Sequence, residues 1–191
     1  MALSGKLEGI EETLREIVAF SEERGAEYIG TPARLLLGAV LAAGGRLKEG
    51  LNLLGESRRT WYENSNRLRC ATSEYILGNL YAGLARKEGP PSASREASGG
   101  PVVPSLSKAE AAAKALEAFE KLVEMEKEMG ARDLLGPAHL QLGLLHRALG
   151  HKEQAAKHLS LARGVFEECG AETHLERLGQ YLPGGEGKVL S

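Results

Sequence analysis

Histidine is the residue type in this sequence with the most evident potential for chemistry, because it binds transition metals and transfers protons near neutral pH. His139 and His146 are seven residues apart, which places them on one face of a helix, and His151 and His158 share that spacing. Helical metal pairs usually have a spacing of four residues and a carboxylate, as in H-E-x-x-H, which is absent. We therefore predict partly buried packing histidines and no metal site.

Other motifs that could support catalysis are incomplete. In the segment GGEGKVLS, Leu182 stands where a phosphate-binding loop requires glycine, and Val189 stands where it requires serine or threonine. Cys70 and Cys169 occur in no CxxC or metal-ligand spacing, and we predict two small buried hydrophobic residues. Because no nucleophile–base pair can be assembled, the sequence predicts neither an enzyme nor a bound cofactor.

A basic cluster surrounds the one tryptophan of the chain. It consists of Arg58, Arg59, Arg67 and Arg69, with Trp61 and Tyr62 between them. Such a cluster can bind nucleic acid, but Glu56, Glu63 and Glu74 interleave with the arginines. We therefore favour a solvated helix junction in which Trp61 packs between helices.

An acidic segment follows later in the chain. Residues 117–128 hold five glutamates against two lysines, which is typical of a solvated outer face, with an acidic docking strip as the alternative. Glu117 and Lys121 are spaced for a favourable ion pair along one helix.

The composition narrows the class of protein. The formal net charge is −2 and the pI is about 6.2, which argues against a general nucleic-acid or anionic-membrane binder. No apolar run reaches the roughly 20 residues of a membrane-spanning helix, and the start lacks a signal-peptide pattern. We therefore expect a cytoplasmic protein.

Apolar residues recur at helical spacing through almost the whole chain, and no alternating strand pattern appears. Gly25, Gly130 and Gly170 each follow such a run and suit the left-handed position that ends a helix. Thr31 and Pro32 are predicted to be the N-cap and first residue of a helix. The sequence thus predicts an all-α fold of seven to eight helices: 4–24, 31–44, 46–64, 66–87, 108–129, 136–149, 151–169 and about 171–182.

One internal segment departs from this pattern. Residues 88–107 contain 12 Gly, Pro or Ser in 20 positions, so we predict a mobile loop. Ser107 and Glu110 then form a capping box that begins the next helix. We expect one domain over residues 1–182 and a disordered tail over 183–191.

The sequence also repeats itself. GAEYIGTPARLLLG at 25–38 and GARDLLGPAHLQLG at 130–143 are identical at seven of fourteen positions, and a Leu-Gly pair recurs at 37–38, 77–78 and 142–143. Without the loop, the pairs are about 40 residues apart, which predicts stacked antiparallel helix pairs.

The three repeated glycines fall in helix interiors. Glycine there costs about 0.5–1 kcal/mol relative to alanine. We therefore predict that a neighbouring helix approaches Gly38, Gly78 and Gly143 too closely for a Cβ atom.

At these positions the chain resembles the tetratricopeptide repeat, whose signature is L-G-x2-Y in the first helix and A-x3-F in the second. LGNLY at 77–81 matches, and LGLLH at 142–146 is followed by Ala155, Leu159 and Ala162 at the expected spacings. The signature tryptophan is missing, since its positions hold Arg34, Glu74 and His139. The resemblance implies a right-handed α-solenoid with a concave groove.

A narrower resemblance concerns TSEYILGNLYAGLA and the segment GPAHLQLGLLHRALGHKEQAAKHLSLARGVFEECGAE. These are similar to C-terminal repeat regions of large bacterial proteins that carry a class III adenylate/guanylate cyclase domain and an AAA-type ATPase. The resemblance implies a sensory or autoinhibitory module acting on its parent chain, without catalytic parts of its own.

The repeat register gives the side chains expected to line the groove. They are Leu35, Ala39, Tyr75, Asn79, Leu140, Leu144 and Arg147. Because this set is mostly apolar, we expect a protein-interaction scaffold that binds a peptide or an amphipathic helix, from a partner or from its parent chain. A homodimer and a small-ligand sensor are the alternatives, and we expect no nucleic-acid or membrane partner.

Overall fold

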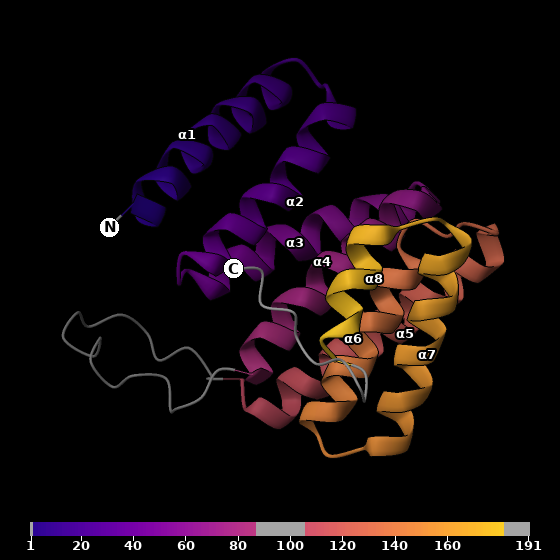
Figure 1. Ribbon diagram of the computed structural model, residues 1–191. Helices are drawn as coiled ribbons and strands as arrows, with labels where there is room; N and C mark the ends of the chain where they lie inside the picture. The colour runs from indigo at the N-terminus through magenta and orange to yellow at the C-terminus, as the bar shows by residue number, and fades with distance from the viewer. Residues whose placement is uncertain (1, 87–105, 182–191) are drawn as a thin grey trace.

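The computed structural model describes residues 2–86 and 106–181, and within these residues it contains helices and no strands (Figure 1). The helices are α1 (Ala2–Glu23), α2 (Glu27–Ala43), α3 (Leu47–Glu63), α4 (Arg67–Arg86), α5 (Lys108–Met129), α6 (Leu135–Ala148), α7 (Lys152–Glu168) and α8 (Glu172–Gly179). The all-α prediction is confirmed. Most of the predicted loop 88–107 and the tail 183–191 lie outside the described residues. None of the described helices combines the length and apolar character needed to cross a bilayer.

The six described turns between consecutive helices have the same hydrogen-bonding pattern. After α2, for example, the Gly45 N–H donates to the Ala42 carbonyl at 3.2 Å and the Arg46 N–H donates to the Leu41 carbonyl at 2.9 Å. This pair of bonds is the Schellman motif, which requires a residue with positive φ at the first position after the helix cap. The positive-φ residues are Gly25, Gly45, Ser65, Gly130, Gly150 and Gly170.

The start of α2 differs from the prediction. The helix begins at Glu27 rather than after Thr31, so Pro32 lies inside it. The additional turn brings Gly30 against the Ser21 side chain of α1, and Pro32 cannot donate the backbone hydrogen bond that other residues donate inside a helix. The capping box of α5 is confirmed, because the Ser107 Oγ accepts from the Glu110 N–H and the Glu110 carboxylate accepts from the Ser107 N–H.

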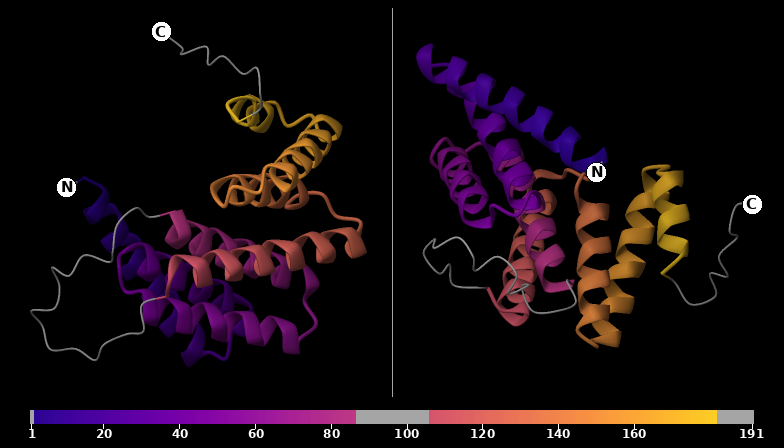
Figure 2. Two further views of the ribbon diagram at one scale, coloured as in Figure 1. Left: turned by 90° about the horizontal axis from the view of Figure 1, so that it is seen from below. Right: turned by 90° about the vertical axis from the view of Figure 1, so that its left-hand side faces the viewer.

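The helices pack in antiparallel pairs that lie side by side, with α1 at one end of the molecule and α8 at the other (Figure 2). The pairs are α2 with α3, α4 with α5 and α6 with α7, while α1 covers α2 and α8 covers α7. Successive pairs meet through α3 and α4 and through α5 and α6, and α4 also touches both α2 and α6. The pair α4–α5 therefore lies between the other two.

Hydrophobic clusters cross the boundaries between pairs. Leu35 of α2 packs with Leu54 and Trp61 of α3 and with Leu77 of α4. Phe119 of α5 belongs to a cluster that draws on α4, α5 and α6. Each pair thus depends on its neighbour to bury its apolar face, as expected for a repeat architecture.

The prediction for the interior glycines is confirmed. A Cβ atom on Gly38 would lie 3.1 Å from the Leu54 amide nitrogen of α3, and one on Gly143 would lie 3.1 Å from the Leu159 amide nitrogen of α7. A Cβ atom on Gly78 would lie 2.7 Å from the Phe119 ring. In all three pairs a Cβ atom would clash with the neighbouring helix, through its backbone at Gly38 and Gly143 and through the Phe119 ring at Gly78.

Candidate interaction surface

Two of the predicted groove residues contribute to the core. Leu35 and Leu140 are only 2% and 7% exposed, and they lie in separate hydrophobic clusters. Leu35 is covered because α2 contacts α1, α3 and α4. Leu140 packs with Leu159 and Phe166 of α7. In this arrangement neither leucine presents its side chain to a partner.

Three other predicted groove residues are half-buried. Ala39 lies on α2, while Tyr75 and Asn79 lie one turn apart on α4. The Asn79 side-chain amide donates to the Tyr75 carbonyl at 2.8 Å, so one of its donors is used within its own helix. The Tyr75 ring contacts the edge of the Phe119 ring, with centroids 6.3 Å apart. These polar groups thus serve local packing.

Leu144 and Arg147 line a cleft beside α8. Arg86 and Tyr181 complete its wall together with Ala148, and neither Tyr75 nor Asn79 takes part. The Arg147 guanidinium lies 4.8 Å from the centre of the Tyr181 ring and donates to the Tyr181 carbonyl at 3.3 Å. Arg147 therefore holds the end of the described chain against α6.

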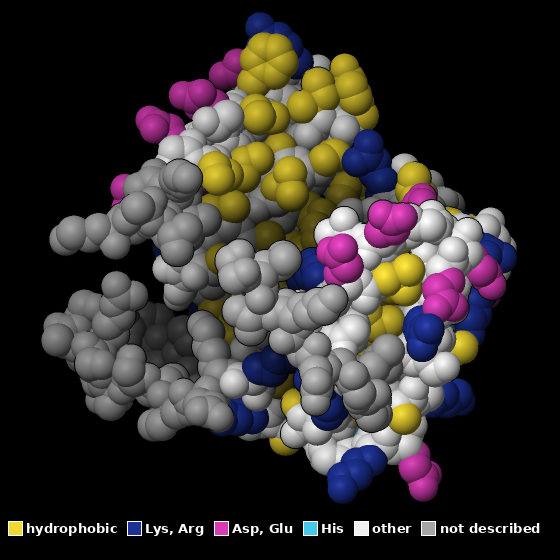
Figure 3. All heavy atoms as spheres, viewed as in Figure 1, with side chains coloured by type: hydrophobic (Ala, Val, Ile, Leu, Met, Phe, Trp, Pro, Cys, Tyr) yellow, Lys and Arg dark blue, Asp and Glu magenta, His cyan; other side chains and the backbone are white. Residues whose placement is uncertain are grey.

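Of the seven large hydrophobic side chains that are exposed among the described residues, four lie on α1 and α2. Ile10 and Phe20 are each 48% exposed and Leu36 is 50% exposed, and the exposed fraction of Tyr28 is larger, at 78%. Hydrophobic side chains gather over α1 and α2 on the face shown in Figure 3. We call the exposed apolar side chains of α1 and α2, namely Ile10, Phe20 and Leu36, the apolar end surface.

The sequence contains a signal for this surface that the repeat register does not use. Residues 35–37 are three consecutive leucines, and successive residues of a helix point about 100° apart, so the three cannot share one narrow buried face. Leu35 and Leu37 are buried and Leu36 is exposed. When a run of apolar residues is wider than one helix face, at least one of these residues is therefore predicted to be exposed.

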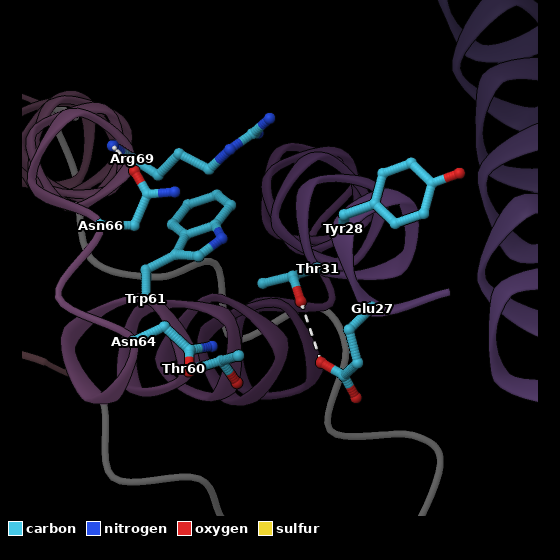
Figure 4. A pocket seen from close by; sticks show the side chains of 8 residues that line it. All are labelled: Glu27, Tyr28, Thr31, Thr60, Trp61, Asn64, Asn66 and Arg69. Atoms are coloured by element: carbon cyan, nitrogen blue, oxygen red, sulfur yellow. Dashed lines mark hydrogen bonds between the residues drawn. The ribbon is translucent and has the colours of Figure 1, made fainter. Parts of the chain in front are cut away.

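A small pocket lies at the turn between α3 and α4 (Figure 4). Its volume is about 120 Å³, and the Trp61 indole and the Thr31 side chain face it together with Glu27 and Arg69. Thr31 donates to the Glu27 carboxylate at 3.3 Å, and the Arg69 guanidinium lies 5.7 Å from the centre of the Trp61 ring. Trp61 is buried, which confirms that it packs between helices.

The predicted basic cluster is divided between different partners. Arg67 pairs with Glu128 of α5, and Arg69 lies over Trp61. Arg58 instead donates to Glu74 of α4 at 2.7 Å. Three of the four arginines thus contact different partners.

The acidic segment is also less uniform than predicted. Glu126 is buried, and its carboxylate accepts the Leu134 N–H at 3.1 Å across the turn between α5 and α6, so it is not part of a solvated face. Burial raises the pKa of this carboxyl. Lys121 lies 3.7 Å from Glu74 and is not paired with Glu117 in the described structure.

Four histidines come together between α6 and α7. The Nδ1 atoms of His139 and His158 lie 3.0 Å apart, and those of His146 and His151 lie 3.3 Å apart. The rings of His146 and His158 stack with centroids 5.5 Å apart. His139 and His146 are buried, as predicted, and the described residues contain no group of three or more ligands placed for a metal ion.

The two cysteines differ in burial. Cys70 is buried in the cluster around Trp61, as predicted, and burial raises the pKa of its thiol. Cys169 is exposed after the end of α7, so the prediction that it is buried was wrong. It occupies the C-cap position of α7, next to the turn that leads to α8.

Comparison with known proteins adds no family assignment. No family model matches this sequence, and a search of curated proteins finds no match. A functional proposal for this chain therefore rests on the fold and on the surfaces described above.

Proposed function

We propose that this chain is a non-catalytic protein-interaction module, and that its apolar end surface binds an amphipathic helix of a partner protein. We further propose that the stack is a right-handed α-solenoid of the tetratricopeptide type. The observation that carries the function is the half-exposure of Ile10, Phe20 and Leu36 at one end of the stack. The paired packing and the close contacts at interior glycines support the solenoid.

The dimensions of this surface suit a short helix. Ile10 and Phe20 are ten residues apart on α1, which corresponds to about 15 Å along the helix axis and a rotation of about 80° around it. An amphipathic helix that presents anchors at positions i, i+4 and i+7 covers about 10 Å. Two to three turns of a partner therefore match the length of the apolar end surface.

The experiment compares two exposed leucines that lie on different faces. Leu36 lies on α2 within the apolar end surface, whereas Leu161 lies on α7 and is 42% exposed. Each is replaced by glutamate, and partners captured by photo-crosslinking are identified and mapped by mass spectrometry. We expect the Leu36→Glu protein to lose crosslinks between α1 or α2 and an apolar helical segment, and the Leu161→Glu protein to retain them.

Two outcomes would reject this proposal. Crosslinks that persist in the Leu36→Glu protein would place the binding surface elsewhere. Crosslinks to a second copy of the chain, with a sedimentation coefficient that falls on Leu36→Glu substitution, would assign the surface to a homodimer. Leu140→Glu is not suitable for this test, because Leu140 is buried and its replacement would unfold the chain.

A further inference from the structure

A cleft between α3 and α5, with α4 as its floor, gathers four cationic side chains. Arg58 and Arg59 come from α3, and Lys114 and Lys121 come from α5. Two hollows lie here: one is lined by Lys114 and the other by Arg59, and both are lined by Arg58 and Lys121. We call these four residues the cationic cleft.

The cationic side chains of this cleft have more hydrogen-bond donors than there are acceptors around them in the described structure. Within the described residues, Glu74 is the one carboxylate that pairs with them: it accepts from the Arg58 Nε at 2.7 Å and lies 3.7 Å from the Lys121 Nζ. Arg58 has five N–H donors, and in the described structure its Nε donates to Glu74. Glu117 also lines the cleft, and among the described residues it forms no ion pair with any of the four cations.

The rings of two tyrosines contact three of the four cations. Lys121 lies 4.3 Å from the centre of the Tyr62 ring and Arg58 lies 5.3 Å from it, while Lys114 lies 5.8 Å from the centre of the Tyr81 ring. The Tyr62 hydroxyl donates to Glu74 at 2.7 Å, which fixes the ring. Such cation–π contacts restrict the cationic side chain before an anion binds, so that it loses less conformational entropy on binding.

We propose that the cationic cleft binds the phosphate group of a small molecule. The outer edge of the Arg58 guanidinium offers two parallel donors, a geometry that matches two oxygens of a phosphate. Lys114 and Lys121 supply the further positive charge that a dianion requires. The hollow bounded by Arg58, Lys114 and Lys121 has a volume of about 140 Å³, which suits a phosphate or pyrophosphate group better than a polypeptide segment. This site is separate from the apolar end surface, so each proposal can fail without the other.

Titration calorimetry with the purified chain tests this site, with inorganic phosphate and pyrophosphate as probes and a phosphoserine peptide as a third arm. We expect pyrophosphate to bind more tightly than phosphate, and Lys114→Gln or Lys121→Gln to weaken binding by about tenfold, equivalent to one charge-assisted hydrogen bond. Lys127→Gln is the matched control, because Lys127 lies on α5 outside the cleft and loses the same charge.

A further variant tests the role of Glu74. Because this carboxylate competes with an anion for Arg58 and Lys121, we expect Glu74→Gln to tighten pyrophosphate binding, with folding checked by thermal unfolding. Binding that is absent, or that weakens equally with Lys127→Gln, would overturn the proposal. Binding of the phosphopeptide alone would overturn the assignment to a small molecule.

Discussion

Gly38 of α2 and Gly50 of α3 meet backbone to backbone. A Cβ atom on Gly38 would lie 2.7 Å from the Gly50 carbonyl oxygen, and a Cβ atom on Gly50 would lie 2.5 Å from the Gly38 carbonyl oxygen. Neither carbonyl can move without disturbing its own helix. Two glycines thus allow α2 and α3 to pack more closely than any other residue pair would permit.

Gly38→Ala is expected to destabilise the protein despite the higher helix propensity of alanine. We expect the free energy of unfolding to fall by about 1–3 kcal/mol, because the added methyl group forces α2 away from α3. Urea titration followed by circular dichroism measures this change. Gly55→Ala is the control, since nothing lies within 4 Å of a Cβ atom there and alanine should stabilise α3 by up to about 1 kcal/mol. Equal effects of the two substitutions would contradict the close-packing explanation.

Gly78 and Phe119 should be energetically coupled. The Phe119 ring fills the space that a Cβ atom on Gly78 would need, at 2.7 Å. Gly78→Ala alone should lower stability, as should Phe119→Leu alone, by about 1–3 kcal/mol each. The double variant should be more stable than the sum predicts, by at least about 0.5 kcal/mol in a double-mutant cycle. Strict additivity would show that the ring adjusts freely to the methyl group.

Ser65 is the one residue with a left-handed backbone among the described turns that is not glycine, with φ at 54°. A side chain in this conformation costs about 1 kcal/mol or more, so Ser65→Gly should raise the melting temperature. The reverse substitution, Gly150→Ser at φ 81°, should lower it by a similar amount. A melting temperature that falls with Ser65→Gly would indicate that the serine side chain stabilises this turn.

The four-histidine cluster should make stability depend on pH. Burial lowers the pKa of His139 to about 4, and burial also lowers the pKa values of His146 and His158. These side chains bind protons more readily in the unfolded chain than in the folded chain. Their contribution to the free energy of unfolding is therefore complete above the ordinary pKa of 6.5, and it is lost as the pH falls towards 4. His139 alone accounts for a loss of up to about 3 kcal/mol.

Charged groups from the neighbouring helices act on this cluster as well. Lys127 of α5 and Lys157 of α7 oppose protonation of His139 and His158, while Glu120 of α5 favours protonation of His146. Urea unfolding at pH 8 and pH 5 measures the difference in stability. The difference should shrink in His139→Phe and persist in His174→Gln, whose histidine lies on α8 outside the cluster. An unchanged pH dependence in His139→Phe would assign the effect to other groups.

The sequence predicted the helices well because the signals that end a helix are local. Each left-handed glycine, and the capping box at Ser107, acts within a few residues. The start of α2 was missed because its first turn is stabilised by packing against Ser21, which is a tertiary contact. Proline and threonine signals alone cannot report such a contact.

The groove residues were harder to predict for a similar reason. The repeat register identifies which residues share a helix face, but burial depends on how many neighbours that face has. Leu35 is covered because α2 contacts three helices, whereas Leu36, the next residue, is half exposed. The cationic cleft was not predicted, because Arg58 and Lys121 are far apart in the sequence and Glu74 brings them together.

The uniform turns have a consequence for how such a chain can change in evolution. Because six turns repeat one hydrogen-bonded geometry, the backbone at each of these six junctions sets the direction of the second helix relative to the first. Duplication or deletion of an entire hairpin would therefore preserve the orientation of the helices after it. A protein built in this way can gain or lose whole helix pairs, while the side chains on its surface change independently.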